Sequence, residues 1–188
     1  MKKLLLMLLA VAAFAGCSKE DEVQEAWSYI FQQIGKSNLS AMDVMTSADY
    51  WATNVIYYYT EAGGKGDSKL YYDADGPIRE GENKNRAYKV ADGNMYEYHW
   101  HPIYSILYYY TYSLSGSGNN FTIVRKHDNF SKTMSIVAYD DNNMVIEYYD
   151  PRSKSYPYSR EYMVRWSPSD EFWDRQIAYE DLPEDIKP

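Results

Sequence analysis

The sequence predicts a mainly β protein: an antiparallel up-and-down barrel of about eight strands, with an N-terminal helix and a short C-terminal helix. From Tyr50 onward, short segments rich in Tyr, Val, Ile and Thr recur, and these residues are favoured in strands. Clusters of Gly, Asp, Asn, Pro and Ser separate the segments, as expected for tight turns. Many consecutive strands without intervening helices favour a closed barrel over a parallel sheet.

The N-terminus predicts export from the cytoplasm. A positive start, an apolar run from Leu4 to Phe14 and the small residues Ala15-Gly16 are typical of a secretory signal peptide, here residues 1–16. The run is too short to span a bilayer, which needs about 20 apolar residues. Cys17, the only cysteine of the chain, follows directly. The arrangement resembles the signal of bacterial lipoproteins, which implies that Cys17 is lipidated and anchors the protein in a membrane.

Residues 17–22 are expected to form a lipidated acidic tether. Ser18, directly after the cysteine, resembles the residue type of lipoproteins that are sorted to the outer membrane. The acidic cluster that follows resembles the surface-export signal of lipoproteins in Bacteroidetes-type bacteria. The alternative is a solvated tether with the domain on the periplasmic face. Both interpretations place the folded domain in the cell envelope, outside the cytoplasm.

The charge of the chain argues against nucleic acid as a partner. The formal net charge is −8, and loss of Lys2 and Lys3 with the signal peptide takes it to −10. Phosphate backbones and anionic membrane surfaces repel such a protein.

Residues 23–49 are expected to form an N-terminal helical segment, and residues 50–188 a barrel domain that follows it. Apolar residues at helical spacing predict a helix over Asp21–Ile34, with Gly35 as its stop. Asn38–Asp49 is expected to be a short helix or an ordered loop. The sequence leaves three placements open for the first helix: inside the barrel as a plug, packed on its outside, or in contact with a partner.

Nine strand segments are expected, near Trp51–Thr60, Lys69–Tyr72, Arg86–Val90, Asn94–His101, Ile106–Leu114, Asn120–Lys126, Met134–Tyr139, Met144–Tyr149 and Arg160–Trp166. A C-terminal helix is expected to begin at Ser167–Asp170, with Phe172, Trp173, Ile177 and Ala178 offering a face to pack.

The order of the strand segments resembles a known family. The stretch Tyr88–Tyr98 is followed by Tyr-Thr-Tyr-Ser-Leu at Tyr110–Leu114, then by Phe-Thr-Ile-Val and Met-Val-Ile-Glu-Tyr. This order resembles the small lipocalin-like (calycin-type) lipoproteins of Bacteroidetes-type bacteria, over roughly Tyr50–Trp166. The resemblance implies strands that follow one another around a ligand-binding barrel.

Tyrosine dominates the aromatic residues, with 22 Tyr against 5 Phe. Alternate strand residues share a face, so Tyr108, Tyr110 and Tyr112 are expected to line the barrel with Leu114. Such a barrel interior is a packed core or a cavity for one small ligand. The residues expected to bind the ligand are Tyr96, Tyr98, Trp100, Tyr108, Tyr110, Tyr112 and Tyr148.

Histidines supply the candidates for a metal site. His99 and His101 share a strand face, and two histidines at this spacing can reach one zinc ion. His127 is the only other histidine. A solvent-facing polar row is the alternative, and no metal or cofactor is predicted.

These observations predict a non-enzymatic outer-membrane lipoprotein that binds a small amphipathic or hydrophobic ligand in an aromatic-lined barrel. The alternative is a surface-exposed interaction module that contacts glycans or envelope proteins through exposed tyrosines. A metal-dependent hydrolase built on His99, His101 and His127 is a third hypothesis.

Overall fold

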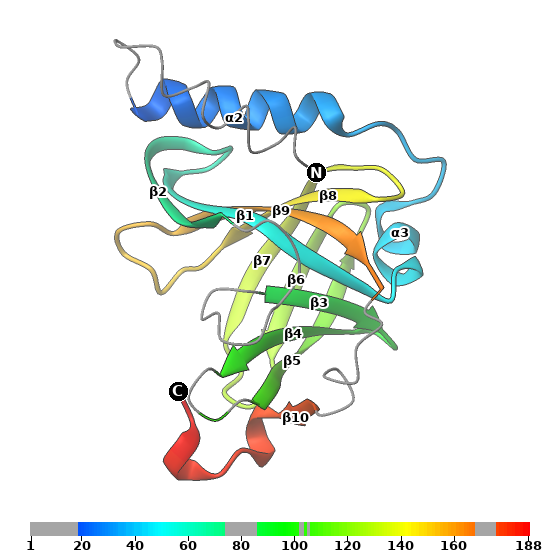
Figure 1. Cartoon of the computed structure of the whole chain (residues 1–188), viewed down its shortest axis with the longest axis vertical. Coiled ribbons are helices and arrows are strands. Elements are labelled where there is room, and N and C mark those ends of the chain that lie inside the picture. The colour runs from blue at the N-terminus through cyan, green and yellow to red at the C-terminus, as the bar shows by residue number, and fades with distance from the viewer. Residues whose placement is uncertain (1–18, 74–85, 102–103, 105, 168–175) are drawn as a thin grey trace.

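The computed structural model describes residues 19–73, 86–101, 104, 106–167 and 176–188 (Figure 1). Eight strands close into an antiparallel barrel, as the sequence predicts. They are β1 (Tyr50–Glu61), β3 (Arg86–Ala91), β4 (Asn94–His101), β5 (Ile106–Ser117), β6 (Asn120–Arg125), β7 (Ser131–Tyr139), β8 (Asn143–Tyr149) and β9 (Tyr158–Trp166).

Sequential strands pair around the barrel, apart from two places. Strand β9 returns to β1, along Tyr50↔Trp166 to Tyr59↔Tyr158, which closes the ring. Strand β2 (Lys65–Asp73) pairs only with the second half of β1 and extends beyond the barrel. The first half of β1 pairs with β3 instead.

Turn residues explain where the hairpins reverse. Between β3 and β4, Asp92 and Gly93 have φ values of 52° and 72°. Two successive residues at positive φ match the right-handed twist of a tight hairpin, and Asp-Gly is a favoured pair for this turn. The hairpin fixes the register of β3 and β4, from Ala91↔Asn94 to Arg86↔His99.

The helix α2 (Lys19–Gln33) lies outside the barrel, across the strands β1, β8 and β9 (Figure 1). Its Val23 and Trp27 are buried against Tyr59 and Val145. The Trp27 indole N–H donates a hydrogen bond to the Tyr59 hydroxyl. Of the three placements open for this helix, the structure therefore shows packing on the outside.

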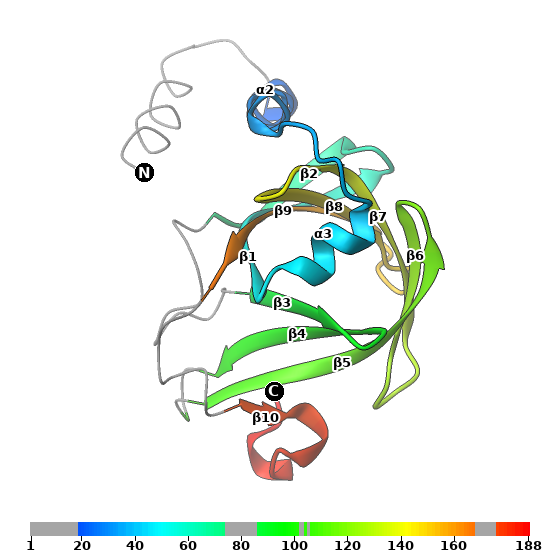
Figure 2. The same ribbon diagram turned by 90° about the vertical axis from the view of Figure 1, so that its right-hand side faces the viewer.

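The short helix α3 (Ala41–Ser47) closes one end of the barrel (Figure 2). The Ser40 side chain caps it by accepting a hydrogen bond from the Asp43 amide. Val44 and Met45 are buried in the barrel core. The Trp51 indole N–H donates to the Met45 carbonyl oxygen at 3.0 Å, so the helix is fixed to the first strand of the barrel.

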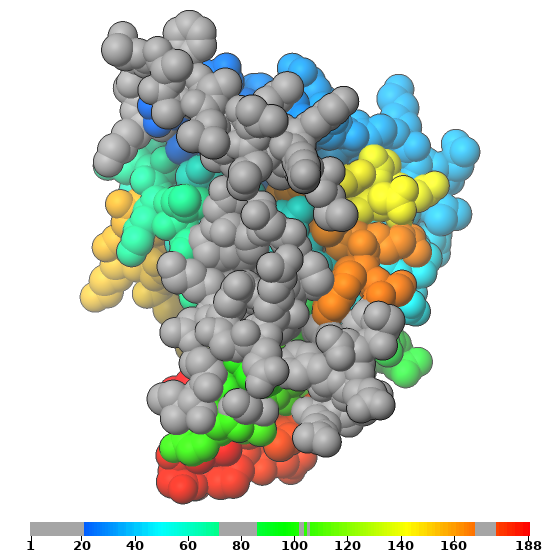
Figure 3. Space-filling model, in the orientation of Figure 1, coloured from blue at the N-terminus to red at the C-terminus, as the bar shows by residue number. Residues whose placement is uncertain are grey.

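The described C-terminus differs from the expected helix. Residues 168–175, where the helix was expected to start, lie outside the described residues. Ile177 and Ala178 lie in a strand, β10 (Gln176–Ala178), which runs parallel to β5. Two 3-10 turns follow, Tyr179–Asp181 and Glu184–Ile186. This C-terminal segment packs beside β5, and Figure 3 shows it at the bottom of the molecule, in red.

The predicted signal peptide and Cys17 also lie outside the described residues. Residues 19–22 of the predicted tether instead form the first turn of α2. None of the helices in the described ranges combines the length and the apolar character that a membrane span requires.

Because α3 closes the barrel with a buried methionine, truncating this side chain is expected to destabilise the fold strongly. Met45→Ala is expected to lower the free energy of unfolding by about 2–5 kcal/mol, because it leaves a cavity in the core. Met42→Ala is the matched control: Met42 is on the same helix but only partly buried. Urea unfolding of both variants checks the prediction, and equal losses would contradict it.

Candidate ligand-binding site

The inward-facing side chains change in character along the barrel. At the end closed by α3 they are apolar. Towards the opposite end they become polar and aromatic, because His99 pairs with Arg86 and Tyr108 while Met95 pairs with Val90 and Tyr112. We call this second region the polar end; it consists of Arg86, Glu97, His99, Tyr108, Tyr110, Tyr112, Lys132, Tyr148 and Glu161.

Arg86 joins two buried carboxylates within the polar end. Its Nη1 atom lies 3.3 Å from Glu161 Oε1 and 3.6 Å from Glu97 Oε1. Only 1% of the Glu161 side chain and 5% of the Glu97 side chain are exposed. Arg86 comes from β3, Glu97 from β4 and Glu161 from β9, so one guanidinium links three strands.

Further contacts hold each carboxylate in place. The Tyr88 hydroxyl donates to Glu161 Oε2 at 2.9 Å, and the Thr53 hydroxyl donates to the same oxygen at 3.3 Å. His99 Nε2 lies 3.2 Å from Glu97 Oε1. Buried carboxylates with such partners are fixed in orientation.

The two carboxyl groups titrate differently. Burial raises the pKa of Glu161 above its ordinary value, although Arg86 opposes the change. Burial alone would also raise the pKa of Glu97, but the cations Lys132 and Arg86 outweigh it and hold this pKa well below its usual range. Glu97 is therefore ionised at neutral pH.

His99 is uncharged at neutral pH. Burial lowers its pKa, and the neighbouring Glu97 carboxylate only partly offsets that effect. The neutral ring stacks on Tyr108, with ring centroids 5.4 Å apart.

Four of the seven expected ligand-binding residues face the interior, namely Tyr108, Tyr110, Tyr112 and Tyr148. Tyr112 and Tyr148 are buried in the core, and Tyr110 packs against it. The other three, Tyr96, Tyr98 and Trp100, lie on the outer face of β4. There they belong to an outer aromatic cluster with Tyr50, Tyr109 and Trp166.

The large apolar side chains that are exposed among the described residues do not gather in one place. They lie on the α2–α3 connection, the strands β2, β7 and β8, and the described residue after β4. These are Leu39, Leu70, Tyr71, Tyr104, Val137 and Tyr149.

Each of the three histidines lies against a tyrosine ring. His101 lies 4.9 Å from Tyr104, and His127 lies 4.5 Å from Tyr179, centroid to centroid. Within the described ranges, no group of three or more His, Cys, Asp or Glu side chains is arranged to hold a metal ion.

Sequence reasoning missed Arg86, Lys132 and Glu161 as members of the site. The sequence signal that could have found them is strand alternation, in which every second residue faces the same side of the sheet. Lys132 lies two residues from the core residue Met134, and Glu161 lies two residues from Met163. Each charged residue is therefore on the same, inward-facing side of its strand as a core methionine.

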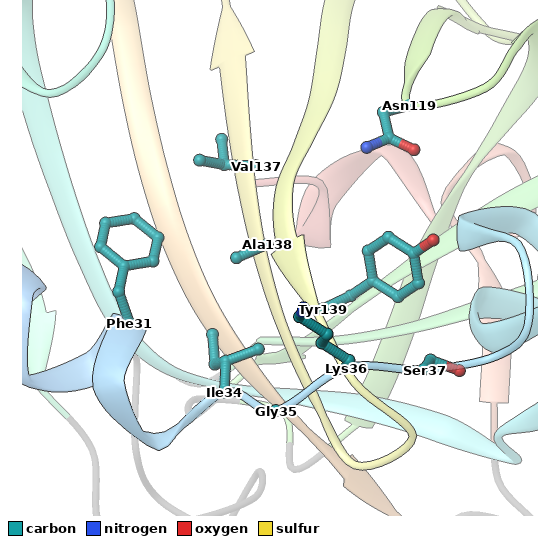
Figure 4. A pocket seen from close by; sticks show the side chains of 9 residues that line it. All are labelled: Phe31, Ile34, Gly35, Lys36, Ser37, Asn119, Val137, Ala138 and Tyr139. Carbon is teal, nitrogen blue, oxygen red and sulfur yellow. The ribbon is translucent and has the colours of Figure 1, made fainter.

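A separate groove of about 410 Å³ lies outside the barrel. Figure 4 shows it between the end of α2 and strand β7, with Asn119 of the β5–β6 turn at its rim. Its walls mix apolar side chains, such as Ile34 and Val137, with polar ones. It lacks the converging charged and aromatic groups of the polar end, which is therefore the stronger candidate site.

Comparison of the chain with protein-family models and with curated proteins finds no match. The function of the barrel must therefore be argued from the geometry of the polar end and from the N-terminal sequence.

The opposite titration of the carboxyl groups predicts different behaviour for two conservative variants. Glu97→Gln is expected to lower the free energy of unfolding at pH 7 by about 3 kcal/mol, because it breaks a buried ion pair. A depressed pKa stabilises the fold above the unfolded value of 4.5 and loses that contribution as pH falls. The variant should therefore lose less stability than the wild type in acid.

Glu161→Gln is the matched control. Its raised pKa means that ionisation of Glu161 costs stability as pH rises above 4.5, so removing the charge is expected to cost less at pH 7 than Glu97→Gln does. Urea unfolding across pH 3 to 8 measures both variants. Identical pH profiles for the two would contradict the assignment.

Proposed function

We propose that this chain is a non-enzymatic outer-membrane lipoprotein whose barrel binds a small amphipathic ligand at the polar end. The observation that carries the proposal is the set of four inward-facing tyrosines that extends from the polar end into the core, beside charged side chains. Tyrosine offers an apolar ring face with a polar edge, which suits amphipathic molecules.

Partial exposure of inward-facing side chains supports access to the polar end. The Arg86 side chain is 17% exposed and that of His99 is 20% exposed. Both belong to the polar end, so this part of the barrel is in contact with solvent. Tyr108 lies level with His99 at this end of the barrel, and Tyr110 lies one step further in, level with Glu97.

The buried carboxylates support binding rather than catalysis. Glu97 and Glu161 are almost completely buried, and both are engaged by Arg86. In this arrangement the carboxylates hold strands together and do not present a free acid or base to a substrate.

The proposed cellular location of the protein is based on the N-terminal sequence. The apolar run, Ala15-Gly16 and the single Cys17 resemble a lipoprotein signal, and the strand order resembles lipocalin-like lipoproteins of Bacteroidetes-type bacteria. The barrel architecture is consistent with that family. We place the domain in the cell envelope on these grounds.

Ligand binding is tested by native mass spectrometry. Residues 18–188 incubated with an extract of growth medium are expected to acquire an adduct of a few hundred daltons. Tyr110→Ala should weaken the adduct, because it removes a ring from the polar end. Tyr96→Ala is the matched control, since Tyr96 lies on the outer face. Adduct formation that depends on Tyr96 rather than Tyr110 would instead favour the interaction module.

Lipidation is tested by metabolic labelling. The full chain expressed in a Gram-negative bacterium with radioactive palmitate is expected to be labelled and to sediment with membranes. Cys17→Ser should abolish both the label and the sedimentation, because acyl chains hold the protein on the membrane. Membrane association of an unlabelled wild-type protein would rule out the anchor.

A further inference from the structure

Lys132 is a cation inside the barrel that lacks a direct acceptor. It lies on β7 in step with Met134 and Ile136, whose side chains fill the core. Its ammonium group sits 4.4 Å from the Tyr148 ring centroid and 5.3 Å from that of Tyr112. Among the described residues, Lys132 makes neither a hydrogen bond nor an ion pair. An ammonium group has three hydrogen-bond donors, and these donors remain available.

The Tyr148 hydroxyl is a second available group beside Lys132. Tyr148 is only 2% exposed, and its hydroxyl oxygen has no hydrogen-bond partner of normal geometry within the described structure. The Tyr88 phenol donates its own proton to Glu161, and its oxygen is the neighbouring acceptor that affects the Tyr148 pKa. Buried polar groups are normally satisfied, so an unpaired hydroxyl next to an unpaired ammonium indicates a missing acceptor.

The other cations of the region are already engaged. Arg86 contacts both buried carboxylates. Arg125 donates two hydrogen bonds to Asp128, at 2.9 and 2.6 Å. Lys132 therefore differs from them in having no carboxylate within ion-pair distance among the described residues. Lys132 does act on the ionised Glu97 carboxylate, whose pKa it lowers, but without a direct ion-pair contact.

The packing of the opposite end limits the size of the ligand. There α3 and Trp51 fill the barrel together with buried methionines, of which Met95 and Met144 are no more than 1% exposed. A long alkyl chain cannot extend through this packed core. The rings of Tyr112 and Tyr148 lie beside the Lys132 ammonium group, and Tyr110 lies on the same inward face of β5 as Tyr112.

We infer that the ligand is a compact ring-containing acid, whose carboxylate accepts hydrogen bonds from Lys132 and Tyr148 while its ring packs on the tyrosines of the polar end. The inference rests on the proposed binding function and adds the chemical class of the ligand. Charged hydrogen bonds of this kind are stronger than neutral ones, so they should dominate selectivity.

The test compares three probes of the same shape: a naphthalene carboxylate, the matching naphthalene methanol and the matching naphthalene methylamine. Binding to residues 18–188 is measured by isothermal titration calorimetry. The carboxylate is expected to bind at least about tenfold more tightly than the alcohol. Lys132→Met should remove this preference, and Tyr148→Phe should reduce it.

Lys89→Met is the matched control. Lys89 also lies over a tyrosine ring, 5.3 Å from the Tyr50 centroid, but on the outer face of the barrel. The preference for the acid should survive this change. Equal binding of acid and alcohol, or tighter binding of the amine, would overturn the inference and leave the binding function standing. Failure of all three probes to bind would overturn both.

Discussion

The contact on which the structure depends most is the shared ion pair of Arg86 with Glu97 and Glu161 inside the barrel. Removing a carboxylate from water costs several kcal/mol unless a cation and hydrogen bonds replace the water. Two such groups face each other here, from β4 and β9, and the guanidinium of β3 contacts both. If any of these strands slipped by one residue, its charged group would point outward. The same contacts therefore fix both the register of the barrel strands and the arrangement of the polar end.

That constraint divides the aromatic residues between two faces. With Glu97 inward, the neighbouring Tyr96, Tyr98 and Trp100 must point outward, where they pack with Tyr50 and Tyr109. On β5 the paired register places Tyr110 opposite Glu97, and hence inside. The tyrosines thus fall into two groups: an outer cluster that packs on the sheet, and an inner group that lies beside the buried charged residues.

Most of the fold could be predicted from the sequence, because its signals are local. Turn clusters and β-favouring segments located all nine predicted strands, and helical periodicity located α2. Strand β10 could not be predicted, since its parallel pairing with β5 depends on a contact between distant parts of the chain. The inward face of β4 was ambiguous for a different reason. Alternation defines two faces, but whether aromatic or charged residues turn inward depends on Arg86 and Glu161, on other strands.

The division of the interior into an apolar half closed by α3 and a polar half open to a ligand is the central claim. It is tested most directly by a crystal structure of residues 18–188 grown with a brominated naphthoic acid. The account predicts an anomalous bromine peak inside the barrel, among Tyr110, Tyr112 and Tyr148. A peak confined to the outer groove at Val137, or to the outer aromatic cluster, would contradict it.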